Sequence, residues 1–88
     1  MDAEQKKIKE IEEMIVAILH GLLGKDENCE VKSLSGGRTT VFEISVPKAK
    51  VGQIIGKGGR NADAIRNLVT AAAAGKEIKR RISIEILD

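Results

Sequence analysis

The stretch that decides the fold is Val51-Gly52-Gln53-Ile54-Ile55-Gly56-Lys57-Gly58-Gly59-Arg60. Three of the four positions from Gly56 to Gly59 are glycine, and apolar segments lie on both sides of them. Glycine lets the chain turn sharply and lets a ligand approach the backbone without a Cβ in the way. The amides of such a loop, together with the start of a following helix, form an anion site. Lys57 and Arg60 add cationic side chains suited to phosphate.

Two nucleotide-binding motifs with similar glycines do not fit this loop. A Walker A loop has Ser or Thr after its Gly-Lys pair, whereas Lys57 is followed by Gly58. A dinucleotide fingerprint would need glycine at Asn61 and a preceding strand rather than a helix. We therefore expect neither a bound cofactor nor a small-molecule substrate.

The chain before the loop predicts a helix, a hairpin and a short second helix. Asp2 and Gln5 have the spacing of a capping box, and apolar residues then recur at helical spacing. Phe42 alternates in phase with Ile44, which places it in the core. The expected elements are a helix from Asp2 to Gly24, a strand over Cys29–Leu34, a turn over Ser35–Arg38, a strand over Thr39–Val46 and a helix over Lys48–Ile55.

The chain after the loop predicts a longer helix over Asn61–Ala74 and a final strand over Arg80–Leu87. The expected buried stripe of this helix is Ala62, Ile65, Leu68, Val69 and Ala72. A right-handed crossover would place the last strand parallel to the second one. The expected fold is therefore an α+β two-layer sandwich with the order α-β-β-α-α-β. Its three-stranded mixed sheet is covered on one face by three helices.

Charge is divided unevenly along the 88 residues, although the net charge is only +2. The balance is −4 up to Glu30 and +6 from Val31 onward. A basic remainder favours one face for polyanions, but an ordinary solvated surface explains the division equally well. Phe42 is the one aromatic residue, which excludes RRM and cold-shock modules because these need exposed aromatics.

Several other classes of protein lack support in the sequence. Cys29 is the only cysteine, so we expect a small, half-buried apolar residue in a reducing cytoplasm, with no internal disulfide and no zinc cluster. The apolar stretch Met14–Leu23 is too short to span a membrane, and no signal peptide is recognisable. No nucleophile–base pair or metal constellation appears, so we expect no enzyme, no metal and no membrane partner.

The glycine loop also carries a family resemblance. Ile54-Ile55-Gly56-Lys57-Gly58-Gly59, with Ile65 six residues later, resembles the signature of KH domains, whose GXXG loop clamps four nucleotides of a single strand. A helix and a strand before the core resemble the type II, or prokaryotic, arrangement. The chain is similar to the small bacterial single-KH proteins of the KhpA family. The resemblance implies one KH domain over residues 1–88, with an extension at 1–34 and a β-α-α-β core at 39–87.

The resemblance further implies a nucleic-acid-binding groove with an aliphatic floor. One wall would be the loop and its flanking helices, and the other would be the final strand. A solubilising loop, a helix surface or a solvated turn are the alternative interpretations of its cations. The implied binding residues are Gly52, Ile55, Gly56, Lys57, Gly58, Gly59, Arg60, Arg66, Arg80, Arg81 and Ile82.

Three functions remain open at this point. The first is a single-stranded RNA-binding module, as an RNA chaperone or post-transcriptional regulator. The second is a protein-interaction or dimerisation module on a KH scaffold, favoured by the apolar first helix and the Ile-rich edge strand. The third is single-stranded DNA binding. Contact with four nucleotides gives modest affinity, so a second KH unit would raise avidity. The resemblance implies a KhpB-like protein or a homodimer as that partner.

Overall fold

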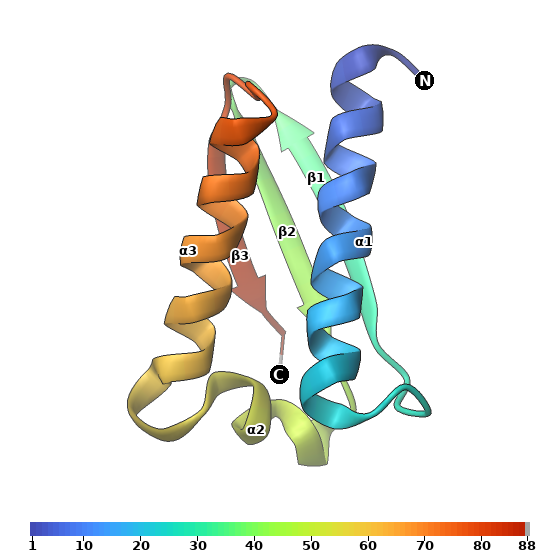
Figure 1. Cartoon of the computed structure of the whole chain (residues 1–88), viewed down its shortest axis with the longest axis vertical. Helices are drawn as coiled ribbons and strands as arrows, with labels where there is room; N and C mark the ends of the chain where they lie inside the picture. Colours follow the sequence, from blue (N-terminus) through green and yellow to red (C-terminus); the bar gives the residue numbers. More distant parts are fainter. Residues whose placement is uncertain (88) are drawn as a thin grey trace.

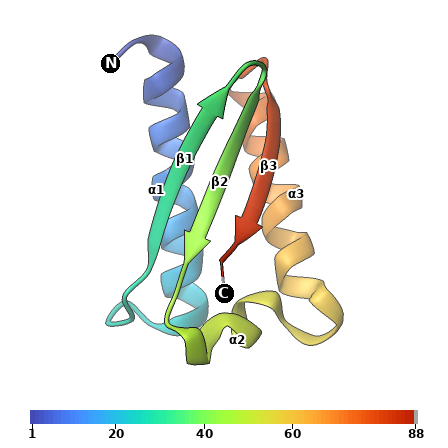
Figure 2. The ribbon, with the colours of Figure 1, turned by 180° about the vertical axis from the view of Figure 1, so that it is seen from behind.

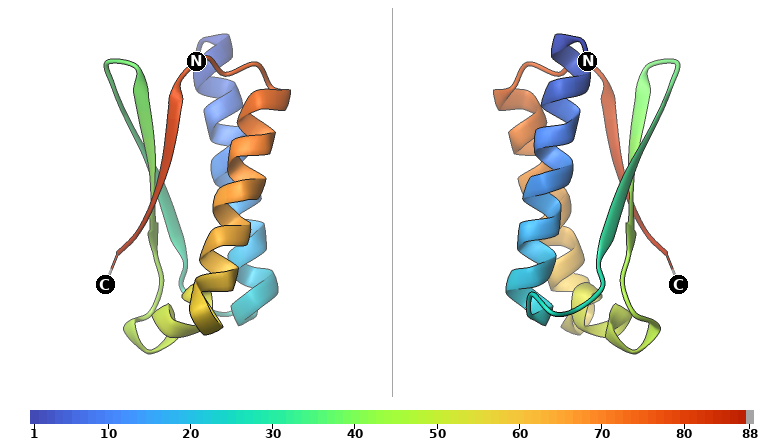
Figure 3. Two further views of the ribbon diagram at one scale, coloured as in Figure 1. Left: turned by 90° about the vertical axis from the view of Figure 1, so that its left-hand side faces the viewer. Right: turned by 90° about the vertical axis from the view of Figure 1, so that its right-hand side faces the viewer.

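The computed structural model describes residues 1–87 and contains two layers, a sheet and the helices on one of its faces (Figures 1 and 3). The strand order is β1-β2-β3, with β1 antiparallel to β2 and β2 parallel to β3. This arrangement confirms the expected α+β fold. The elements are α1 Ala3–Leu23, β1 Glu30–Gly36, β2 Thr39–Ser45, α2 Val51–Ile55, α3 Arg60–Gly75 and β3 Arg81–Ile86, with short 3-10 turns at Lys48–Lys50 and Lys57–Gly59.

Helix α1 begins at the predicted capping box. The Gln5 amide donates to Asp2 Oδ1 over 2.8 Å, and the Asp2 amide donates to Gln5 Oε1 over 3.0 Å. Its apolar stripe packs into the core, and the buried members lie at helical spacing. These buried residues are Ile8, Ile11, Ile15 and Leu19. The stripe is therefore part of the core and is not open to a partner.

The β1–β2 hairpin is tighter than the sequence predicted. The turn lies within the expected segment Ser35–Arg38 but is shorter, because β1 continues to Gly36, which pairs with Thr39. Only Gly37 and Arg38 form the loop, and Gly37 has a φ of +56°. Two-residue hairpin loops require positive φ because their twist must match that of the strands, and glycine supplies it without strain.

The core lies between β2 and the helices. Phe42 and Ile44 of β2 are fully buried, as predicted for Phe42, and they pack in one cluster with residues of all three α-helices. The prediction for Leu68 is wrong, because its side chain is 53% exposed. Successive residues of a helix are rotated by about 100° about its axis. Leu68 therefore lies at the edge of the buried stripe, on the side opposite Ala62 and Ala73. The buried residues of α3 are Ala62, Ile65, Val69 and Ala73.

The two ends of the molecule carry different loops (Figures 1 and 2). The glycine loop between α2 and α3 lies at one end, where β2 and β3 finish. The hairpin turn and the connection from α3 to β3 lie at the opposite end. Strand β3 runs from the hairpin end toward the glycine-loop end, parallel to β2. Within residues 1–87, no helix is both long enough and apolar enough to cross a membrane.

Candidate nucleic-acid interface

The glycine loop has a backbone shape that other residues rarely adopt. Gly56, Gly58 and Gly59 have φ angles of +78°, +65° and +79°. The Gly56 amide ends α2 by donating to Gly52 O over 2.9 Å, and the Gly59 amide donates to Gly56 O over 3.1 Å. The chain thus turns from α2 within four residues and starts α3 at Arg60. Each of the three positive φ angles is met by a glycine, which explains their presence in the sequence.

Two amide side chains hold the loop in place. Asn61 Nδ2 donates to Gln53 O over 3.0 Å, which joins the first turn of α3 to α2. Gln53 Nε2 donates to Leu22 O over 2.9 Å, which joins α2 to the last turn of α1. A Cβ built on Gly56 would lie only 2.7 Å from Asn61 Cγ. Gln53 and Asn61 were not predicted as positioning residues, although an amide side chain on each side of the glycine loop is a signal in the sequence.

The electrostatics at the loop favour an anion. Gly59 is the N-cap of α3, and no side chain caps this helix start. The first amides of a helix have no acceptor within the helix and carry the positive end of its dipole. Lys57 and Arg60 are exposed and form no ion pair within the described chain. The loop therefore places two exposed cations beside the positive end of the α3 dipole, an arrangement suited to phosphate.

A groove lies beside this loop, between the first turns of α3 and the last residues of β3. Its lining is mixed, with aliphatic side chains beside charged ones, and Ile55 contributes a side chain that is 37% exposed. Arg66 stands at the groove with its guanidinium 3.4 Å from Asp63 Oδ1, in an exposed pair. The lining residues are Ile55, Gly58, Gly59, Ala62, Asp63, Arg66, Ile84, Glu85 and Ile86. Such a surface can hold bases on its floor while the loop holds phosphates.

The structure brings together most of the predicted site residues. Ile55, Gly58, Gly59 and Arg66 line the groove. The other loop residues adjoin it, and Gly52 is exposed on α2. These residues come from three consecutive elements that meet at one end of the molecule (Figure 1).

Arg80, Arg81 and Ile82 do not join that group. Strand β3 starts at the hairpin end, where Arg81 pairs with Thr39, and only its last residues reach the glycine loop. The strand wall of the groove is therefore Ile84–Ile86 instead of the start of β3. The predicted parallel pairing already implied this placement. The end of β2 leads into α2 and the glycine loop, so the end of a parallel β3 must lie at the same end of the molecule.

The guanidinium of Arg80 is bound within the protein. Its Nε donates to Thr40 Oγ1 over 2.8 Å, and its Nη2 donates to the carbonyls of Gly37 and Thr39 over 2.9 and 3.1 Å. Its Nη1 also lies 3.6 Å from Glu4 Oε1, and the side chain is 16% exposed. Arg80 thus fastens the hairpin to the start of β3 and to α1.

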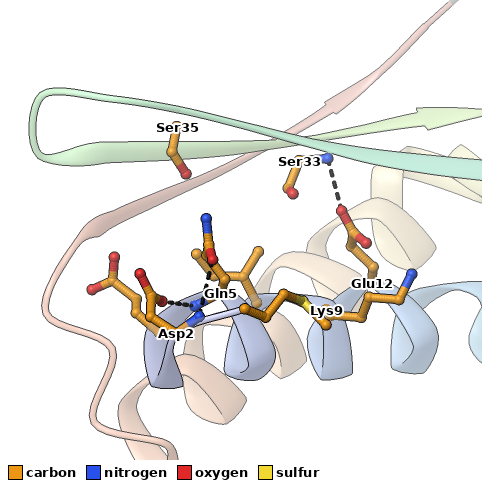
Figure 4. A pocket seen from close by; sticks show the side chains of 9 residues that line it. Asp2, Gln5, Lys9, Glu12, Ser33 and Ser35 are labelled. Carbon is orange, nitrogen blue, oxygen red and sulfur yellow. Dashed lines mark hydrogen bonds between the residues drawn. The ribbon is translucent and has the colours of Figure 1, made fainter.

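A second hollow between α1 and β1 is poorly suited to nucleic acid (Figure 4). Asp2, Glu4 and Glu12 contribute carboxylates to its lining, whereas Lys9 is its only cationic side chain. Glu12 Oε2 accepts a 3.0 Å hydrogen bond from the amide of Ser33 on the edge strand. Asp63 and Glu85 also line the groove, but the groove adjoins Lys57 and Arg60 of the glycine loop. This hollow has three carboxylates against one cationic side chain, so we do not assign nucleic acid to it.

Comparison with known proteins gives a consistent result. The family model described as KhpA/KhpB, KH domain, matches residues 12–86. The chain is 35% identical over 78 residues to the RNA-binding protein KhpA of Chlamydia pneumoniae, covering 89% of this chain and 97% of that protein. It is 40% identical over 76 residues to the RNA-binding protein KhpA of Borreliella burgdorferi, covering 86% and 90% respectively. No solved structure matches the chain significantly.

Proposed function

Because the chain belongs to the KhpA/KhpB family of KH domains, we propose that it binds single-stranded RNA through its glycine loop and the adjoining groove. The observation that carries the proposal is the start of α3, which no side chain caps, beside a groove that includes Ile55, Ile84 and Ile86. Phosphates would lie at the start of α3, with Lys57 and Arg60 as adjustable cations. Bases would lie against Ile55, Ile84 and Ile86. The relatives are named as RNA-binding proteins and not as enzymes, which supports a non-catalytic role.

The groove accounts for binding but gives little base selectivity. GXXG loops contact about four nucleotides. Backbone contacts carry no sequence information by themselves. We therefore propose a role on many transcripts, as an RNA chaperone or post-transcriptional regulator.

Salt dependence tests the phosphate clamp. A loop that neutralises about three or four phosphates should give a slope near −2 to −3 in log affinity against log salt. Binding of a short unstructured RNA, measured by fluorescence anisotropy, should weaken roughly 20- to 50-fold between about 50 and 200 mM salt. A slope near zero would show that the cations of the loop do not contact phosphate.

A double variant tests the loop itself. In K57D/G58D, the new side chain at position 58 meets no atom within 4 Å, and Asp tolerates the left-handed region better than most residues. We expect a folded protein whose RNA affinity falls about tenfold or more, since charge-assisted contacts become repulsive. The matched control is K25D/N28D, with the same change in charge on the exposed α1–β1 connection. A folded K57D/G58D protein that binds like the control would contradict the proposal.

Competition with DNA tests the alternative ligand. An RNA and a DNA of equal length and sequence would be mixed with the protein, and the bound fractions compared. We expect RNA to be preferred, because the relatives are named RNA-binding proteins. Preferential binding of DNA would favour the alternative function.

We also propose association with a second KH unit, either a KhpB-like protein or another copy of this chain. The description of the family names KhpA and KhpB together. In addition, the apolar side chain of Leu68 is 53% exposed on the surface of α3. The stripe of α1 does not support association, because it is buried in the core. Sedimentation equilibrium should show self-association that L68Q weakens. A monomer at all concentrations would exclude the homodimer.

A further inference from the structure

A cluster of cations occupies the hairpin end of the molecule, opposite the glycine loop. Arg38 comes from the hairpin turn, Lys79 from the connection between α3 and β3, and Arg81 from the start of β3. All three are exposed, and they border a shallow hollow together with Thr39, Ile78 and Arg80. We call Arg38, Lys79 and Arg81 the hairpin-end patch.

Backbone contacts bring these three residues together. The Arg81 amide donates to Arg38 O over 2.7 Å, so the two arginines are neighbours across the two segments. Arg80 binds the carbonyls on both sides of Arg38 and fixes the turn against the start of β3. Ile78 is only 7% exposed and anchors the chain just before Lys79. The patch is therefore held by ordered structure and is not a tail of mobile cations.

The neighbouring charges leave the patch positive. Lys76 pairs with Glu10 over 3.1 Å, and Arg80 pairs with Glu4 over 3.6 Å, so these two cations are already matched by acids of α1. Within residues 1–87, the three patch cations form no ion pair. Glu77 is the one acid on the α3–β3 connection. Planar guanidinium groups can bind phosphate oxygens through two parallel hydrogen bonds.

The patch is too far from the glycine loop to serve the same nucleotides. The two lie at opposite ends of the longest dimension, which extends 35 Å between Cα atoms (Figure 1). At the 3.4 Å spacing of phosphates along a stacked strand, this length corresponds to about ten nucleotides. Four nucleotides held at the loop therefore end well short of the patch.

We propose that the hairpin-end patch is a second phosphate-binding surface, which contacts the same RNA strand beyond the nucleotides held in the groove. The inference rests on the proposed function, because the groove sets the position of the strand. The expected contact is with the backbone alone, since the patch offers no apolar floor for bases. The domain would then bind long single strands more tightly and with a steeper salt dependence than short ones.

RNA length and a triple variant test this proposal. Affinities of the parent and of R38Q/K79Q/R81Q would be measured with an unstructured RNA of 6 nucleotides and one of 14 nucleotides. The variant should bind the shorter RNA like the parent. With the longer RNA, its salt slope should be smaller by about 2, since three phosphate contacts each contribute about 0.7. For the RNA of 14 nucleotides, the affinity of the parent should therefore fall about 16-fold more than that of the variant between about 50 and 200 mM salt.

The control variant is K9Q/K25Q/K32Q, which removes three cations from α1, its connection and β1. It should keep the length dependence of the parent. Equal slopes for the parent and the patch variant on the longer RNA would overturn the proposal. Equal losses of the patch variant on both RNAs would also overturn it, because the patch would then act only through general charge. If the parent fails to bind the shorter RNA, the proposed function itself fails.

Discussion

Gly56 has a backbone conformation that glycine alone adopts readily, with φ +78° and ψ 169°. A side chain here would also collide with Asn61, whose amide group holds the loop. We expect G56A to lower the free energy of unfolding by roughly 2–4 kcal/mol, since backbone strain and overpacking add. Chemical denaturation would measure this. G21A is the control, because the position is helical and open, and it should stabilise by about 0.5–1 kcal/mol. An unchanged stability of G56A would show that Asn61 does not lock the loop.

Cys29 is half-buried, as the sequence predicted, just before β1. Burial raises the pKa of its thiol, and the Glu27 carboxylate adds to the increase in pKa. Less thiolate is therefore present near pH 8 than in an exposed cysteine, and the thiolate is the reactive form. We expect iodoacetamide to modify Cys29 more slowly in the folded protein than in urea, as followed by mass spectrometry. Equal rates would contradict this account of the thiol.

Arg80 joins the tip of the β1–β2 hairpin to the start of β3 and to α1. Its hydrogen bonds satisfy the buried Thr40 hydroxyl together with Ser35, and they satisfy the carbonyls of the turn. We expect R80M to lower the free energy of unfolding by about 2–4 kcal/mol, because several polar groups lose their partner. R80K should restore little of it, since an ammonium group lacks the planar fork.

R81M serves as the control for this prediction, measured by thermal denaturation under the same conditions. Arg81 is exposed and forms no ion pair within the described part of the chain, so its replacement should change the free energy of unfolding by less than about 0.5 kcal/mol. Equal stabilities of R80M and R81M would contradict the structural role of Arg80.

The elements were predictable from the sequence because each has a local signal. The capping box starts α1, the alternation of Phe42 and Ile44 marks β2, and the glycines mark the loop. Properties set by packing were not predictable in the same way. Leu68 has helical spacing from Ile65 but lies on the exposed flank, and only the direction in which α3 faces the sheet decides this. Likewise, nothing local to Arg80 distinguishes a phosphate ligand from a structural arginine.

The whole molecule separates its charges and its loops. The acids of α1 face two cations of the α3–β3 connection, whereas the cations of the glycine loop and of the hairpin-end patch stay unmatched within residues 1–87. The acidic first part of the chain thus neutralises some cations of the basic remainder and leaves others free within this range, and the order of residues alone did not show which. Which end of β3 reaches the groove is also a property of the whole fold, because it follows from the parallel pairing with β2.

The central claim is that the glycine loop and the groove beside it hold single-stranded RNA. The most direct test is an NMR titration of the ¹⁵N-labelled protein with an unstructured RNA of 6 nucleotides. We predict that the largest amide shift changes occur at Gly56–Arg60 and at Ile84–Ile86, on the two sides of the groove. Changes confined to α1 and β1, with the glycine-loop amides unmoved, would contradict the account.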